Sequence, residues 1–269
     1  MSSDLVRLDR DGAVATLTFD DPERLNAMSQ AMGEAFAARV VELCRAGDLR
    51  AVILTGAGRA FSAGGDLEMI EGRAAEGAAA PGTARRAIRD GMRSFYGLFL
   101  AVRELPCPTI AAINGHAIGA GLCVALACDL RIAAARAKLA LNFTKLGLHP
   151  GMGATWTLPR LVGAAAAADL LYTSRQIDGS EAARIGLVSR SLAPKEVLPA
   201  ARALAGEIAA CAPIAVRGVK RALARSAGAT LEDQLSFEAG EQAICFESRD
   251  VHEGLAAARE RRDPRFAGA

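Results

Sequence analysis

Three small residues, Gly119, Ala120 and Gly121, stand where backbone amides could hold an anion. The apolar run from Thr109 to Ile113 before them is typical of a buried strand, and the run from Leu122 to Cys128 after them predicts a helix buried on all sides. The first amides of a helix have no partner within the helix, and they carry the positive end of its dipole. Because small side chains leave these donors open, we predict an anion or oxyanion site at this turn. The alternative is an ordinary strand and helix of the hydrophobic core.

A second glycine-rich turn runs from Gly56 to Leu67, directly after the apolar strand pattern of Ala51–Thr55. Both turns share the G-x-G start of a dinucleotide-binding motif, but Phe61 and Val124 replace its third glycine. The sequence also contains no G-K-[ST] phosphate loop and no G-x-S-x-G nucleophile elbow. Nucleotide binding and α/β-hydrolase chemistry are therefore disfavoured.

The composition is that of a soluble globular protein, with 269 residues, of which 51% are hydrophobic and 23% charged. A net charge of +2 gives no reason to expect a nucleic-acid partner. The six cysteines form no C-x-x-C pair and there are only three histidines, so we expect neither a disulfide framework nor a metal site. The start, Met1–Val6, lacks the apolar segment of a secretory signal, and we expect a cytoplasmic location.

One long uncharged stretch, between Glu104 and Asp129, has the length of a membrane span. It is interrupted by prolines, glycines, an asparagine and a histidine, and it lacks positively charged flanks on one side. We therefore expect no membrane segment here.

The remaining pattern predicts a mixed α/β chain. Leu5–Leu8 and Val14–Phe19 are typical of a hairpin, and a helix is expected to begin near Ser29. The Ala/Gly-rich segment Gly72–Gly82 is interpreted as a mobile surface loop, and Thr83–Leu105 as an amphipathic helix. From residue 195 onward the pattern is helical, which predicts a boundary between residues 1–195 and residues 196–269.

Several motifs in order resemble the crotonase (enoyl-CoA hydratase/isomerase) superfamily. Phe61–Leu67 resembles its F-[SC]-A-G-x-D-[LI] loop. The segment that starts at Pro108 and runs through Gly119–Leu122 to Ala127–Asp129 resembles its second signature. Further similar segments follow the family order and span nearly the whole chain: Pro22–Ala27, Leu146–Pro150, Glu181–Ala182, Gly186–Val188, Glu253–Gly254 and Arg259–Phe266.

The resemblance implies an α/β fold, with a spiral of ββα units in residues 1–195 and a C-terminal α-helical trimerisation region in residues 196–269. It implies homotrimers, or hexamers that are dimers of trimers. It also implies a lyase or isomerase that acts on acyl-CoA thioesters and binds no permanent cofactor, the coenzyme A thioester being the substrate.

The resemblance also assigns roles to particular residues. The thioester carbonyl is expected to be held by the backbone amides of Gly65 and Ala120, which stabilise an enolate more than the starting thioester. Contacts to coenzyme A are expected from Arg24 and Arg261. They are also expected from the second glycine-rich turn, at Ala63, Gly64, Asp66 and Leu67.

The sequence departs from the hydratase pattern at the acid and base positions. A typical hydratase has two glutamates where this chain has Cys123 and Phe143. Other members use an aspartate where this chain has Gly151. Hydration needs a general base and a general acid, each worth about 10²–10⁴ in rate, so a standard hydratase mechanism is not expected.

Replacements for the missing carboxylates are sought among nearby polar residues. His149 is the candidate general base and Cys123 the candidate nucleophile, against the alternatives of a loop-capping histidine and an inert buried thiol. Tyr96, with Arg89 or Arg93, could bind a carboxylate of the acyl group, as a decarboxylase would need. The chain is therefore predicted to be an enolate-stabilising enzyme with unusual acid and base residues. The alternatives are a non-catalytic acyl-CoA binder and a decarboxylase- or isomerase-type member.

Overall fold

The computed structural model describes residues 5–269, and residues 1–4, part of the segment in which no secretory signal was expected, lie outside them. The described chain builds a six-stranded sheet in the order β1-β2-β3-β5-β7-β9 and a three-stranded sheet in the order β4-β6-β8. Only β1 is antiparallel to its neighbour. The strands are β1 (Val6–Asp11), β2 (Val14–Phe19), β3 (Ala51–Gly56), β4 (Ala60–Ser62), β5 (Thr109–Ile113), β6 (His116–Ile118), β7 (Leu130–Ala134), β8 (Leu139–Ala140) and β9 (Arg190–Leu192).

From β3 to β8, successive strands of the chain enter the large and the small sheet alternately. β3, β5 and β7 each enter the large sheet, and the short strand that follows each of them, β4, β6 or β8, enters the small sheet. A helix closes each of these pairs before the next begins. Since each ββα unit adds one parallel strand to both sheets, the units follow one another as a spiral, which confirms the predicted fold class.

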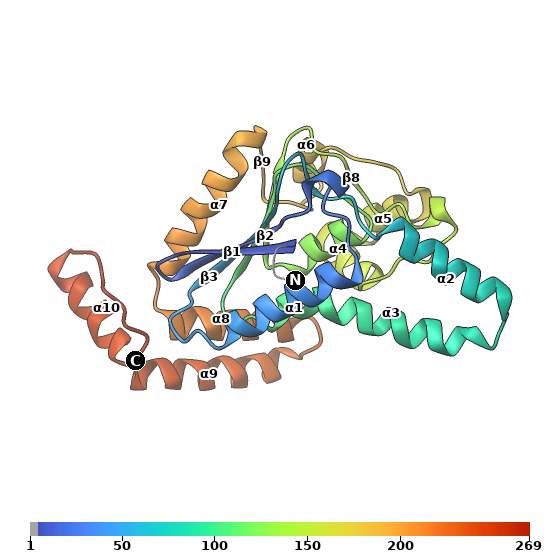
Figure 1. Cartoon of the computed structure of the whole chain (residues 1–269). Helices are drawn as coiled ribbons and strands as arrows, with labels where there is room; N and C mark the ends of the chain where they lie inside the picture. The colour runs from blue at the N-terminus through green and yellow to red at the C-terminus, as the bar shows by residue number, and fades with distance from the viewer. Residues whose placement is uncertain (1–4) are drawn as a thin grey trace.

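Helices cover both faces of the large sheet (Figure 1). α7 packs against β3, β5 and β7 on one side, while α1, α3 and α4 lie on the other. The helices are α1 (Gln30–Cys44), α2 (Leu67–Ala79), α3 (Ala84–Leu100), α4 (Ala120–Ala127), α5 (Ala154–Thr173), α6 (Gly179–Arg184), α7 (Pro194–Ala209), α8 (Pro213–Ser226), α9 (Leu231–Glu247) and α10 (Arg249–Glu260).

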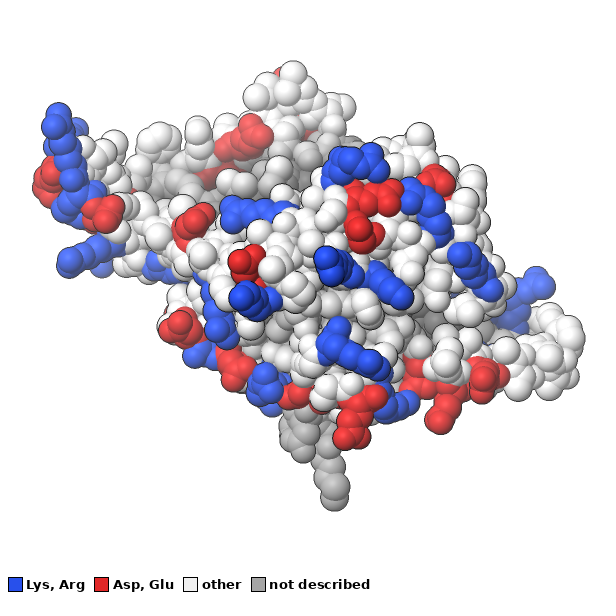
Figure 2. All heavy atoms as spheres, turned by 90° about the horizontal axis from the view of Figure 1, so that it is seen from above, with Lys and Arg blue, Asp and Glu red and all other residues white. Residues whose placement is uncertain are grey.

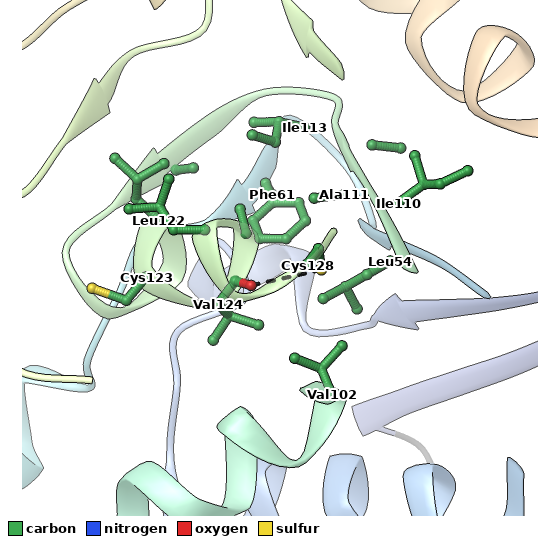
Figure 3. Packing of buried hydrophobic residues seen from close by; sticks show 14 of the residues in the cluster. Leu54, Phe61, Val102, Ile110, Ala111, Ile113, Leu122, Cys123, Val124 and Cys128 are labelled. Carbon is green, nitrogen blue, oxygen red and sulfur yellow. Dashed lines mark hydrogen bonds between the residues drawn. The ribbon is translucent and has the colours of Figure 1, made fainter. Parts of the chain in front are cut away.

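An aromatic cluster joins the N-terminal strands to the helices that flank the cavity described below. The ring of Phe19 on β2 lies 5.4 Å from that of Phe36 on α1, 5.8 Å from that of Phe61 on β4 and 6.3 Å from that of Phe99 on α3. All four side chains are fully buried. Figure 3 shows Phe61 among apolar side chains of β3, β5 and α4. The cluster therefore anchors the end of β4, where the second glycine-rich turn begins.

The prediction of a loop over Gly72–Gly82 was wrong, because most of this segment belongs to α2. The carboxylate of Asp66 caps the helix by accepting hydrogen bonds from the amides of Glu68 and Met69. Alanine has the highest helix propensity, and α2 gains further support by packing on α3. Alanine content was therefore the better guide to this segment than glycine content.

The last helices leave the sheet (Figure 1). α7 still packs on the sheet, whereas α8, α9 and α10 follow as separate helices, and α9 buries none of its residues. The division at residue 195 remains a prediction. No single helix of residues 5–269 has both the length and the apolar character needed to cross a bilayer; α7 and α8 have them only as a pair bent by 110°.

Candidate functional site

A cavity of about 310 Å³ opens between α2, α3 and the two glycine-rich turns. Most of its wall is apolar, as is usual for a small-molecule site, with a few polar groups among the apolar side chains. The lining residues from the turns and from the 142–152 segment are Ala63, Gly64, Gly65, Gly119, Ala120, Asn142, Phe143, Leu146, Leu148, His149 and Met152. Those from the two helices are Leu67, Met69, Ile70, Arg73, Ala74, Ile88, Met92, Phe95 and Tyr96.

In the turn after β4, three of the four backbone amides from Ala63 to Asp66 donate hydrogen bonds within the protein. The Ala63 amide donates to the Leu25 carbonyl at 2.8 Å, and the Asp66 amide to the Met28 carbonyl at 3.2 Å. The Gly64 amide donates to the hydroxyl oxygen of Ser62 at 3.1 Å. The Gly65 amide, between them, donates to no other described residue. Since Gly65 lines the cavity, its amide is a free donor at the cavity wall.

The turn before α4 provides a second free amide. The Gly119 amide donates to the Ala140 carbonyl at 2.7 Å, and Cys123 closes the first helical turn by donating to the Gly119 carbonyl at 3.1 Å. Ala120, the first residue of α4, lines the cavity, and its amide has no acceptor among residues 5–269. It therefore presents an unpaired donor and the positive end of a helix.

The two turns touch through glycines. Gly64 has a φ of +93°, and a β-carbon there would lie 2.5 Å from the Ile118 carbonyl oxygen and 3.5 Å from the Ala120 nitrogen. A β-carbon on Gly121 would lie 2.6 Å from the β-carbon of Ser62. Only glycine permits this approach of two backbones. The structure therefore brings Gly64, Gly65 and Ala120 together at one cavity, and their role in holding a thioester carbonyl remains a prediction.

Arg24 and Asp66 form an ion pair beside this wall. The Asp66 side chain is buried, where it both caps α2 and accepts from the Arg24 guanidinium. Half of the Arg24 side chain remains exposed, and Leu67 is also exposed. Leu67 also lines the cavity, and the contacts of these residues with coenzyme A remain predictions.

Cys123 is buried in α4, and it is not among the cavity-lining residues. Its thiol lies 3.7 Å from the Gly151 carbonyl, to which it donates, and its sulfur points away from Phe61 in Figure 3. Burial raises the pKa of this thiol to about 12. A thiol is nucleophilic only as its thiolate, so these surroundings argue against the predicted nucleophile.

The hydroxyl group of Tyr96 fills the space beside Gly151. A β-carbon on Gly151 would lie 2.4 Å from the Tyr96 hydroxyl oxygen, so the tyrosine takes the space of any side chain at 151. Tyr96 is half-buried and lines the cavity. Burial raises the pKa of its hydroxyl, which keeps it neutral and able to donate a proton or hydrogen bond. An aspartate at position 151, as in other members, would require the Tyr96 side chain to move.

Phe143 and His149 lie on the segment that follows β8, and both line the cavity. Phe143 contributes an apolar surface at the second glutamate position. Nδ1 of the exposed His149 lies 2.8 Å from the Pro150 carbonyl oxygen. Because a carbonyl only accepts, this contact places the proton on Nδ1 and leaves Nε2 with a free lone pair.

Two polar residues of the cavity were missed from the sequence, Arg73 on α2 and Asn142. The sequence signal was the cap residue Asp66. In a helix that begins after it, Ile70 and Arg73 lie on one face by their spacing of three residues. Arg89 and Arg93, considered for a carboxylate, are exposed and do not line this cavity. No aspartate or glutamate side chain of the described chain lines it either.

Arg261 lies at the end of α10, in a left-handed backbone conformation. In Figure 1, α10 is at the opposite end of the molecule from α2 and α3. Within one chain Arg261 is therefore remote from the cavity, and its predicted contact with coenzyme A remains a prediction.

Gly64→Ala should destabilise the protein. A φ of +93° and a carbonyl oxygen at 2.5 Å both oppose a side chain, and strained backbone of this kind costs about 1–3 kcal/mol. Urea unfolding measures the change. Gly72→Ala on α2 is the matched control, since nothing lies within 4 Å, and we expect it to be neutral or stabilising by up to about 1 kcal/mol. Equal stability of Gly64→Ala and the wild type would contradict the assigned contact.

Alkylation should distinguish the cysteines. With a pKa of about 12, the Cys123 thiol is about one part in 10⁴ thiolate at pH 8, and it is also buried. Exposed Cys211 should therefore react with iodoacetamide at least about 100-fold faster, as measured by mass spectrometry of the native protein. Cys123 modification should increase as pH rises toward 12. Equal rates for the two cysteines at pH 8 would restore Cys123 as a nucleophile.

The chain matches the enoyl-CoA hydratase/isomerase family over residues 9–269. It is 38% identical over 267 residues to a Mycobacterium bovis protein called a probable enoyl-CoA hydratase, with 99% of both chains covered. The short-chain-enoyl-CoA hydratase of Clostridium acetobutylicum is 36% identical over 259 residues, covering 96% of this chain and 95% of that one. The crystal structure of an enoyl-CoA hydratase from Bacillus anthracis has a TM-score of 0.87 and 35% identity, covering 98% of this chain and 100% of the other. The chain therefore belongs to the enoyl-CoA hydratase/isomerase family of the crotonase superfamily.

Proposed function

We propose that this protein is an acyl-CoA enzyme that stabilises a thioester enolate with the amides of Gly65 and Ala120. The observation that carries the proposal is that these two amides have no partner in the described chain and line one cavity. Family membership supports a coenzyme A thioester as the ligand. The carbonyl oxygen of that ester would accept from both amides.

This arrangement favours the transition state over the substrate. An enolate oxygen carries negative charge that the thioester carbonyl lacks, so fixed donors gain strength as the reaction proceeds. Removing one such donor costs about 3–4 kcal/mol of transition-state stabilisation in other enzymes. The surrounding hydrogen bonds keep the two turns in place before the substrate arrives, so no reorganisation is needed during the reaction.

His149 is the proposed general base. Its Nε2 lone pair could take a proton from the α-carbon of the acyl group, or from a water that adds to the β-carbon. In either case the electron pair moves to the carbonyl oxygen and forms the enolate. Tyr96, whose neutral phenol is further favoured by burial, which raises its pKa, is the proposed hydrogen-bond donor to the acyl group in the cavity. Cys123 is left out of this mechanism because its thiol is buried and protonated.

A second function, binding of acyl-CoA without turnover, is favoured by one observation. No carboxylate side chain of the described chain lines the cavity, and His149 is exposed. A protein that retained the carbonyl-binding amides without effective acid and base groups would bind thioesters and release them unchanged.

A panel of enoyl-, β,γ-enoyl- and malonyl-type CoA thioesters separates the two functions. We expect turnover of at least one ester, and a fall in kcat of about 10²–10⁴ in His149→Ala with little change in KM. His252→Ala, an exposed histidine on α10, is the control and should retain wild-type rates. Tight binding without turnover of any ester would favour the binding function, and full activity of His149→Ala would remove His149 from the mechanism.

We also propose that the chain assembles as a homotrimer, or as a hexamer of two trimers. α8, α9 and α10 expose large apolar side chains on the single chain: Val219, Leu223, Leu231, Leu235, Ile244, Phe246 and Leu255. Clusters of this kind are typical of protein interfaces. By contrast, basic and acidic side chains are interspersed over the face shown in Figure 2.

Phe246→Asp should weaken this assembly. Phe246 is 68% exposed on α9, so a charge there costs the single chain little but would be buried in an interface. Light scattering after gel filtration should give three or six times the chain mass of 27.9 kDa for the wild type, and a smaller mass for the variant. Val41→Asp, at an isolated half-exposed position on α1, is the control. A monomeric wild type, or an unchanged mass of Phe246→Asp, would contradict the proposal.

A further inference from the structure

Arg73 is the one permanently charged side chain that lines the cavity in residues 5–269. It lies on α2, six residues after the first helical residue, Leu67. At 1.5 Å per residue, this is about 9 Å along the helix from the turn that carries Gly65. The mechanism proposed above does not use it. A cation beside a mostly apolar cavity that lacks acidic side chains could bind a negatively charged part of a ligand.

The guanidinium of Arg73 is only partly engaged. Nη1 donates to the Glu76 carboxylate at 3.0 Å, and the two side chains are 42% and 40% exposed. An exposed pair of this kind contributes little to stability and gives way readily to a competing ligand. Nη2 and Nε donate to no described residue. The fork that matches a carboxylate is therefore still available.

Gly91 on α3 provides the space for this group. A β-carbon at Gly91 would lie 3.1 Å from Nη2 and 3.5 Å from the central carbon of the guanidinium. The guanidinium therefore lies against bare helix backbone, at the wall shared by α2 and α3. Arg73 lines the cavity at this position, and its side chain remains 42% exposed.

The wall between the free amides and Arg73 is apolar. Ile70 reaches within 3.3 Å of a β-carbon position on Gly65, and Met69 and Met92 also line the cavity. A ligand that extends along this wall meets hydrogen-bond donors first, then hydrocarbon, then a cation. No acidic side chain of the described chain lines the path and repels a negative charge.

We propose that the site takes acyl-CoA thioesters whose acyl group ends in a carboxylate, and that Arg73 binds this carboxylate. The inference rests on the proposed function, because it places the thioester carbonyl at Gly65 and Ala120. Two parallel hydrogen bonds from the fork then hold the far end of the chain. Arg73 is a specificity-determining residue and takes no part in the proton transfers.

Equilibrium binding of saturated esters tests the proposal without turnover. Calorimetry compares glutaryl-, adipyl- and suberyl-CoA with pentanoyl-, hexanoyl- and octanoyl-CoA, which have the same numbers of acyl carbons. We expect the wild type to bind at least one dicarboxylic ester about tenfold or more tightly than its neutral counterpart, as suits a charge-assisted contact. Arg73→Ala and Arg73→Gln should lose this preference and keep the affinity for the neutral esters. Arg93→Ala, an exposed arginine on α3, should behave as the wild type.

The other outcomes are equally distinct. Equal wild-type affinity for charged and neutral esters would overturn the carboxylate assignment and leave the proposed function intact. A loss of affinity in Arg73→Ala that is equal for neutral esters and free coenzyme A would place Arg73 on the coenzyme, and would also overturn the assignment. Failure of every CoA ester to bind the wild type would overturn the proposed function itself.

Discussion

The site depends on how the turn after β4 is hydrogen-bonded. The amides of Ala63 and Asp66 donate to carbonyls of the distant segment 25–28, and the Gly64 amide donates to the Ser62 hydroxyl. Only the Gly65 amide is left without an acceptor in the described chain, and Gly65 lines the cavity. Asn26 extends this order, because its side chain donates to the carbonyls of Ala57 and Ala60. A donor fixed in this way before a ligand arrives is the condition for electrostatic stabilisation of a developing charge.

The repeat of ββα units explains why two turns far apart in sequence converge. β4 and β6 are neighbours in the small sheet and run parallel, with Ser62 opposite Ala117. Both glycine-rich turns therefore leave the same end of this sheet, next to each other. Each following helix begins there, so backbone donors collect at one point. The fold itself creates the amide pair, whatever side chains surround it.

The sequence alone was sufficient to predict the two glycine-rich turns, but not the contacts between side chains far apart in the chain. Gly64 and Gly121 belong to short motifs, so both turns could be predicted correctly from neighbouring residues. The side chain that faces Gly151 was not predictable, because Tyr96 reaches it from a helix far away in the chain. Arg73 was missed for a related reason. Its segment looked like a loop by glycine content, and a residue on a loop has no defined face.

Family membership and reaction type rest on different parts of this molecule. The two free amides are backbone groups, and their position follows from the fold that the chain shares with enoyl-CoA hydratases. The polar side chains that line the cavity are His149, Tyr96, Asn142 and Arg73, and no carboxylate of the described chain is among them. Because a fold hosts many reactions through such grafted groups, membership of the family does not by itself establish the reaction. The chemistry of this chain is decided by the groups that surround the fixed amides, and these groups include a cation that a neutral short-chain ester would leave unused.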